Sequence, residues 1–175
     1  SPVQTSGLKP SGGGCPGSQA REIIRKPENV SPDMQPQSSE LRQWPVQLHL
    51  INPLAASYKN SDLLVAADCT AFSVGNFHQR FLKGKSLVIA CPKLDSNQET
   101  YLNKITALID HANINTITVM IMQVPCCGGL LRTVQLAVSA AQRKVPVKLL
   151  IVSVEGEIIQ EQWMMSSELS DEVKR

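Results

Sequence analysis

The sequence has little of what nucleic-acid and membrane proteins depend on. Its 175 residues carry 17 basic and 15 acidic side chains, a net charge of +2 that is too small to attract DNA, RNA or an anionic bilayer strongly. Two Trp, two Tyr and three Phe are too few for a platform on which bases stack. No apolar run approaches the ~20 residues of a membrane-spanning helix, and no secretory signal pattern opens the chain. We therefore expect no nucleic-acid and no membrane partner.

Cysteine is also scarce, and its number is odd. Five cysteines in a chain of this length do not suit a small scaffold held together by disulfides. With 42% apolar residues, the chain can instead bury an ordinary hydrophobic core. We expect a reducing, cytoplasmic compartment in which the thiols stay free, so the cysteines need another explanation.

The composition changes along the chain and predicts three parts. Residues 1–43 hold most of the 11 prolines and the run Gly12–Gly14. Apolar residues are scarce there, so too little surface can be buried to offset the entropy of ordering. We predict a flexible Gly/Pro-rich linker carrying Cys15 over 1–43, an α/β domain over 44–160, and a polar tail over 161–175.

The central part alternates strand-like and helix-like patterns. Five apolar stretches have the length of strands: Val46–Ile51, Leu63–Ala67, Leu87–Ala90, Ile117–Val124 and Val147–Val154. Apolar residues at helical spacing lie between the later strands, in Tyr101–Ala112 and Leu130–Ala141, with a shorter helix around Phe77–Leu82. The alternation predicts a three-layer α/β fold, flavodoxin-like or Rossmann-like, with a mainly parallel sheet of four to five strands flanked by helices.

Four cysteines follow the ends of three predicted strands. Cys69 leaves the second strand, Cys91 directly follows the third, and Cys126 and Cys127 come after the fourth. In open parallel sheets, ligands bind outside the carboxyl ends of the strands, where the loops converge. The pattern therefore predicts that these four thiols meet at one edge of the sheet.

The sequence around the cysteine pair favours a bound anionic group. Cys126 and Cys127 precede a predicted helix, whose N-terminus stabilises a thiolate or an anionic cluster. Gly128 and Gly129 let the backbone approach a bulky ligand. The alternatives are thiols buried only as small core residues and a zinc site, although the Cys-x₂₋₄-Cys pairs usual for structural zinc are absent. An iron–sulfur cluster is favoured because clusters accept thiolates from widely spaced loops.

Several blocks of sequence together carry a family resemblance. They are Gly14–Ser18, Leu41–Leu48, Ala67–Cys69, Asn76–His78, Cys91–Asp95 and Val124–Gly129. In this order they resemble the C-terminal region of the ferredoxin-like 4Fe–4S binding proteins of anaerobic bacteria and archaea. The resemblance implies a cluster-binding redox protein, an electron-transfer component or an oxidoreductase acting on a small molecule. Members of that family carry an N-terminal ferredoxin domain that this chain lacks, so the expected partner is a redox protein or such an upstream domain.

The cysteine spacing is similar to a second motif. Cys91 and Cys126 are separated by 34 residues and Cys127 follows at once. This resembles the first half of the CCG motif of heterodisulfide-reductase subunits, whose adjacent cysteines help to bind a noncubane 4Fe–4S cluster. That motif continues to a later Cys-x-x-Cys, but this chain has no cysteine after Cys127. The resemblance implies that Cys69 and Cys15 supply the missing sulfurs.

The resulting hypothesis is an iron–sulfur cluster, either a 4Fe–4S cube or a noncubane form. Its expected ligands are Cys15, Cys69, Cys91, Cys126 and Cys127, with Gly128 and Gly129 beside them. The competing hypothesis is a non-redox interaction module with buried structural thiols or a zinc site.

Overall fold

Five strands form one sheet in the computed structural model, which describes residues 21–25, 36–165 and 168–169. The strands are β1 (Asp62–Ala67), β2 (Lys85–Ala90), β3 (Thr116–Met122), β4 (Val147–Val152) and β5 (Ile158–Trp163). Their order in the sheet is β2-β1-β3-β4-β5. The first four strands are parallel, and β5 runs antiparallel to β4 at the edge.

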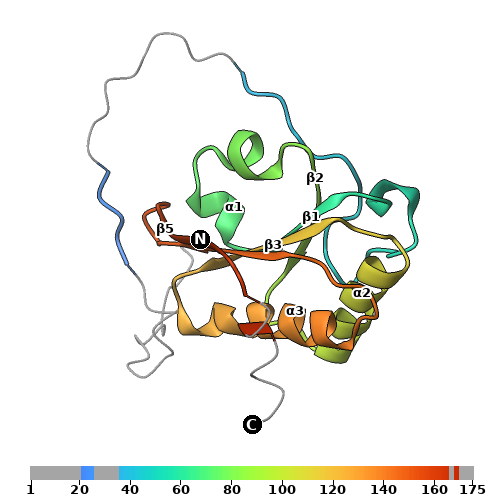
Figure 1. Cartoon of the computed structure of the whole chain (residues 1–175). Coiled ribbons are helices and arrows are strands. Elements are labelled where there is room, and N and C mark those ends of the chain that lie inside the picture. Colours follow the sequence, from blue (N-terminus) through green and yellow to red (C-terminus); the bar gives the residue numbers. More distant parts are fainter. Residues whose placement is uncertain (1–20, 26–35, 166–167, 170–175) are drawn as a thin grey trace, which may run out of the picture.

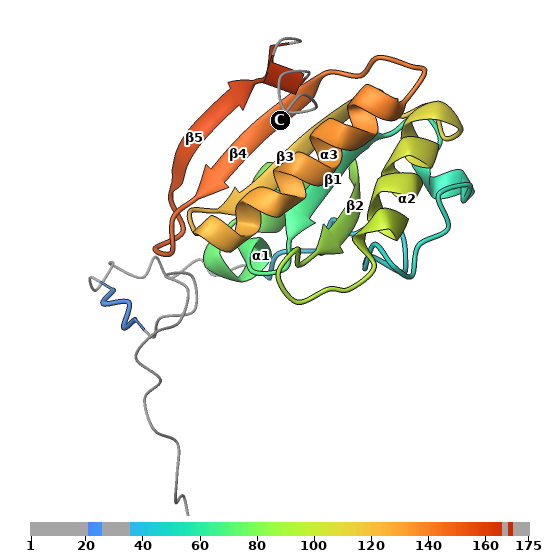
Figure 2. The ribbon, with the colours of Figure 1, turned by 90° about the horizontal axis from the view of Figure 1, so that it is seen from below.

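Helices cover both faces of the sheet. They are η2 (Ala56–Tyr58), α1 (Thr70–Ser73), the π-helical turn η3 (His78–Leu82), α2 (Gln98–Asp110), η4 (Pro125–Cys127) and α3 (Gly128–Ala140). The two long helices α2 and α3 contact each other on one face, while α1 and η3 lie on the opposite face (Figures 1 and 2). The expected three-layer α/β architecture with a mainly parallel sheet is confirmed.

The central strands are buried because they are covered on both faces. Leu63, Leu64 and Val65 of β1 have no exposed surface. On α2, Ile105 and Leu108 come from the apolar stripe of the helix and are also fully buried. Continuous apolar runs in the sequence thus mark the interior strands, as a sheet sandwiched between helices requires.

The predicted strand Val46–Ile51 is not a strand. Gln47 forms a single bridge to Ile89 of β2, and the chain then turns, because the amides of Leu50 and Ile51 both donate to the Gln47 carbonyl. This stretch covers the free edge of β2, which would otherwise expose unpaired backbone groups.

The fifth strand, β5, lies instead at the edge of the sheet next to β4. It follows the last predicted strand, Val147–Val154, in the sequence. β5 extends past residue 160, the predicted end of the domain, and its residues are exposed on both faces from Ile159 to Trp163. Its polar composition, with Gln160, Glu161 and Gln162 in succession, gave no apolar run to detect. Antiparallel edge strands tolerate such exposure because only one neighbour pairs with them.

The chain reverses its winding direction between β1 and β3. From β1 it moves outward to β2, then crosses over β1 to β3 and continues to β4. Such a switch point opens a crevice at the carboxyl ends of the two central strands. In the described part of the chain, no helix is long and apolar enough to cross a membrane.

Candidate functional site: a thiol cluster at the switch point

The loop after β1 positions Cys69. The Cys69 carbonyl accepts hydrogen bonds from the backbone amide and the hydroxyl of Ser73, at 3.2 and 3.0 Å. The Thr70 hydroxyl donates to the carbonyl of Ala67, the last residue of β1, at 2.8 Å. These contacts fix the turn from strand to helix and leave the Cys69 residue exposed at the carboxyl edge of the sheet.

Asp95 organises the loop that carries Cys91. Its Oδ2 atom accepts from the Cys91 amide at 2.8 Å, from Gln47 Nε2 at 3.3 Å and from the Tyr101 hydroxyl. The Asp95 amide in turn donates to the Cys91 carbonyl at 2.9 Å. The loop after β2 is therefore tied both to α2 and to the segment that covers the edge of β2.

Cys126 and Cys127 lie at the end of β3 and the start of α3, as predicted. Both belong to the single turn η4, and Cys127 is the N-cap residue of α3. Cys127 is buried, whereas Cys126 is partly exposed. The positive end of the α3 dipole therefore lies beside this pair of thiols.

The two glycines that follow have different surroundings. No atom lies within 4 Å of the position that a Cβ atom would take on Gly128, so the space beside it is open. A Cβ atom on Gly129 would lie 3.1 Å from Pro92 Cβ. Gly128 fits the expected role of admitting a ligand, while Gly129 allows the loop after Cys91 to pack against α3.

The four thiols interact electrostatically. Although the residue is exposed overall, partial desolvation of the Cys69 thiol raises its pKa, and the thiols of Cys91 and Cys126 raise it further together with the carboxylate of Asp68. Burial raises the pKa of Cys127 to about 11, with smaller contributions from Cys126 and Cys69. These effects agree with the topology, in which the cysteines follow the carboxyl ends of β1, β2 and β3 and so share one edge of the sheet.

The carboxyl group of Asp68, next to Cys69, has one oxygen atom with no hydrogen-bond partner among the described residues. This atom, Oδ1, is buried. Burial raises the pKa of this carboxyl group, and the negative charge of Asp95 adds to the effect. A buried oxygen without a partner is unfavourable, so a bound group with an N–H or O–H donor would be stabilised here.

As the side chains stand, no three His, Cys, Asp or Glu among residues 21–25, 36–165 and 168–169 are grouped around the position of a single metal ion. A cluster differs from one ion, because each of its irons takes its own thiolate. The set of four sulfur donors suits iron–sulfur chemistry. Cys15, the expected fifth ligand, lies outside the described residues.

The structure identifies site residues that the sequence analysis did not assign. Asp95, Gln47 and Tyr101 form the network that holds the Cys91 loop. Gln47 and Tyr101 are more than fifty residues apart in the sequence, so no local sequence pattern could predict their contact. Only the position of Asp95, four residues after Cys91, gave a signal, because Asp side chains often bond to nearby backbone amides in turns.

Comparisons with known proteins agree with the fold. The sequence model of the family described as "Rossmann-like domain" matches residues 55–174. An uncharacterized protein of Archaeoglobus fulgidus is 28% identical over 119 residues, which cover 68% of this chain and 83% of the archaeal one. No solved structure matches the sequence significantly.

Proposed function

Since the chain belongs to the Rossmann-like domain family, we propose that the carboxyl edge of its sheet binds an iron–sulfur cluster and that the protein transfers electrons through it. The observation that carries the proposal is the position of Cys69, Cys91, Cys126 and Cys127 after the carboxyl ends of three neighbouring strands, β1, β2 and β3, around the switch point of the sheet. The partial sequence resemblance to ferredoxin-like 4Fe–4S binding proteins supports the same assignment.

Each part of the site has a role in this proposal. Cys69, Cys91, Cys126 and Cys127 hold the cluster, which would supply one-electron chemistry when bound. The N-terminus of α3 would favour the negative charge of a bound cluster, although burial outweighs this effect for the metal-free thiol of Cys127, and the open space beside Gly128 gives room for the cluster. The ring of Pro92 against Gly129 keeps the two cysteine loops at a fixed spacing.

Cys15 is proposed as a fifth ligand of a noncubane cluster. Arg25 donates from Nη1 to the Glu155 carbonyl at 2.7 Å, which ties residues 21–25 to the turn between β4 and β5. That turn contacts α1, because a Cβ atom on Gly156 would lie 2.1 Å from the Ser73 carbonyl oxygen. Nine residues separate Cys15 from Arg25, and these ten steps along the chain span at most about 35 Å, which is the reach available to a fifth ligand. A cube, in contrast, needs only the four described cysteines.

Catalysis on a small molecule is an extension of the proposal. The unpartnered Oδ1 atom of Asp68 is the observation that favours it. This oxygen can accept a hydrogen bond from a molecule bound against the cluster and so orient that molecule. The redox partner would be a separate protein or an upstream ferredoxin domain.

A second function, docking of a partner without redox chemistry, is favoured by two exposed apolar side chains. Phe72 of α1 is 94% exposed and Leu94 in the Cys91 loop is 81% exposed, and both belong to segments that carry a thiol. In this alternative the thiols are structural or hold zinc, and the apolar side chains bind the partner.

Anaerobic purification followed by determination of iron, acid-labile sulfide and zinc separates the two functions. The proposal predicts about four irons and four sulfides per chain. Replacement of buried Cys127 by Ser should abolish binding, while Ser139→Ala, on the far end of α3, serves as the control that keeps it. A colourless protein without iron, or one with zinc and no sulfide, would favour the docking module.

A further inference from the structure

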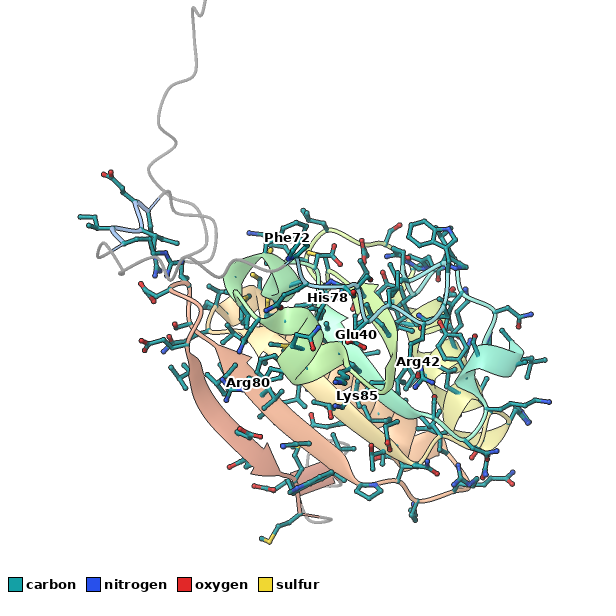
Figure 3. The ribbon with its side chains drawn as sticks, turned by 90° about the horizontal axis from the view of Figure 1, so that it is seen from above. Glu40, Arg42, Phe72, His78, Arg80 and Lys85 are labelled. Carbon is teal, nitrogen blue, oxygen red and sulfur yellow. The ribbon has the colours of Figure 1, made fainter. Side chains whose placement is uncertain are left out.

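A second candidate site lies at the opposite end of the strands, where β1 and β2 begin. A cavity of about 320 Å³ opens there, and its lining includes Arg42, Lys59, Asn60, Ser61, Asp62 and Ser86. Asp62 and Ser86 belong to the first residues of β1 and β2, so this is the amino edge of the sheet. In Figure 3, Arg42 and the neighbouring Lys85 are well separated from Phe72, which lies on the thiol side.

Positive charge and hydrogen-bonding groups dominate the lining. Arg42 and Lys59 are exposed, and neither forms a salt bridge with any residue that the structure describes. Asp62 contributes a single carboxylate, and its Oδ1 atom already accepts from the Thr116 hydroxyl at 2.8 Å. The cavity is therefore electropositive and offers the donors that an anion requires.

Hydrogen bonds anchor the residues next to the two cations. The side-chain amide of Gln43 pairs with β2, because its Nε2 donates to the Leu87 carbonyl and its Oε1 accepts from the Leu87 amide. The same Nε2 atom lies 3.5 Å from the hydroxyl of Tyr58, which is buried. Arg42 directly precedes Gln43 and Lys59 directly follows Tyr58, so both cations extend from one anchored point.

Hydrogen bonds also fix three polar residues of the lining, Asn60, Ser61 and Ser86, before any ligand binds. Asn113 Nδ2 donates to Asn60 Oδ1 at 2.7 Å, and Asn115 Nδ2 donates to the Asn60 carbonyl at 2.8 Å. The hydroxyls of Ser61 and Ser86 are 2.7 Å apart and join the starts of β1 and β2. A rigid site loses little conformational entropy on binding, which favours affinity.

We propose that this cavity binds the phosphate group of a small molecule. Phosphate is the anion whose geometry a guanidinium and an ammonium group recognise together, through paired hydrogen bonds and a point charge. The volume is at the lower end of the range for small-molecule pockets, so a phosphomonoester and free phosphate both fit. The site is separate from the thiol cluster and does not depend on iron–sulfur binding.

Calorimetric titration of the full chain with inorganic phosphate and, separately, with glycerol phosphate tests the proposal. We expect saturable binding of at least one probe at one site per chain. Arg42→Gln and Lys59→Gln should each weaken it about tenfold or more, since each removes a charge-assisted contact. The matched control Lys144→Gln removes the same charge from an exposed lysine that does not line the cavity, and it should leave affinity unchanged.

The relative affinity of the probes distinguishes the two sources of phosphate. Tighter binding of the ester would identify an organic phosphate as the ligand, and tighter binding of the free ion would identify inorganic phosphate. The proposal is overturned if neither probe binds saturably up to about 10 mM. It is also overturned if Lys144→Gln weakens binding as much as the two cavity variants, because the effect would then be one of net charge.

Discussion

Gly129 and Pro92 are in contact across the site: a Cβ atom added to Gly129 would lie 3.1 Å from Pro92 Cβ. Pro92 follows Cys91, and Gly129 lies two residues after Cys127. The contact thus sets the spacing between the two loops that carry most of the thiols. Gly128, one residue earlier in the same helix, has open space in the corresponding direction.

Alanine at these two glycines should therefore have different effects. Gly128→Ala should raise the free energy of unfolding by about 0.4–1 kcal/mol, because alanine adopts the φ of −58° found there without strain and restricts the unfolded chain. Gly129→Ala should lose that gain, since the Pro92 ring must move by a few tenths of an ångström. Urea unfolding of the two variants measures the difference. Equal stability of both would show that Pro92 does not constrain the helix.

The four thiols of the described cluster should differ in reactivity before metal binds. The pKa of Cys127 is raised to about 11 by burial, so its reactive thiolate form is rarer at pH 8 than that of an ordinary cysteine. When metal-free protein is alkylated and analysed by mass spectrometry, Cys127 should be modified more slowly than the other three described cysteines. Modification of Cys127 as fast as exposed Cys69 would contradict the buried position.

Asp68 should make the metal-free protein less stable at neutral pH than at acidic pH. Its folded-state pKa is raised above the ordinary value of 3.8 by burial and by Asp95, so the folded state binds the proton more tightly than the unfolded state. The stabilising effect is present at low pH and is lost as the pH rises through the folded-state pKa.

Asp68→Asn removes this dependence. The variant should unfold at higher urea concentration than the wild type at pH 7, and the difference should disappear when both are measured near pH 4. A variant that is less stable than the wild type at pH 7 would mean that the ionised carboxylate has a stabilising partner.

How much of the fold can be predicted from the sequence differs between interior and edge strands. The apolar runs of β1 to β4 identify the interior strands, because a sheet covered on both faces needs them. The placement of Cys69, Cys91, Cys126 and Cys127 at one edge follows from that topology. The sequence does not predict β5, because an edge strand that is exposed on both faces can be polar. The prediction of a strand over 46–51 is wrong, because an apolar run does not reveal a following turn.

The hydrogen bonds that support the Cys91 loop, and the cavity at the start of the strands, could not be predicted from local sequence patterns. Gln47 and Tyr101 meet at Asp95 only because the segment before η2 covers the edge of β2 next to α2. The cavity between Arg42 and Lys59 depends on the same segment, through Gln43. Both arrangements are long-range, so periodicity and spacing carry no trace of them.

The role of Cys15 separates the two cluster types. If the cluster is noncubane with five thiolates, Cys15→Ser should lower iron content and change the absorption spectrum of the anaerobically loaded protein. If the cluster is a cube held by the four described cysteines, the same variant should leave both unchanged. We expect the loss, and Ser18→Ala in the same block of sequence is the control that should retain wild-type iron content.

X-ray absorption at the iron edge of the anaerobically loaded full chain tests the central claim most directly. A cluster held by the thiols at the switch point predicts a first shell of sulfur around iron and a second shell of neighbouring iron, with both lost in Cys127→Ser. A first shell of nitrogen or oxygen without an iron neighbour would show that the iron is adventitious. That result would contradict the account of this edge of the sheet as an iron–sulfur site.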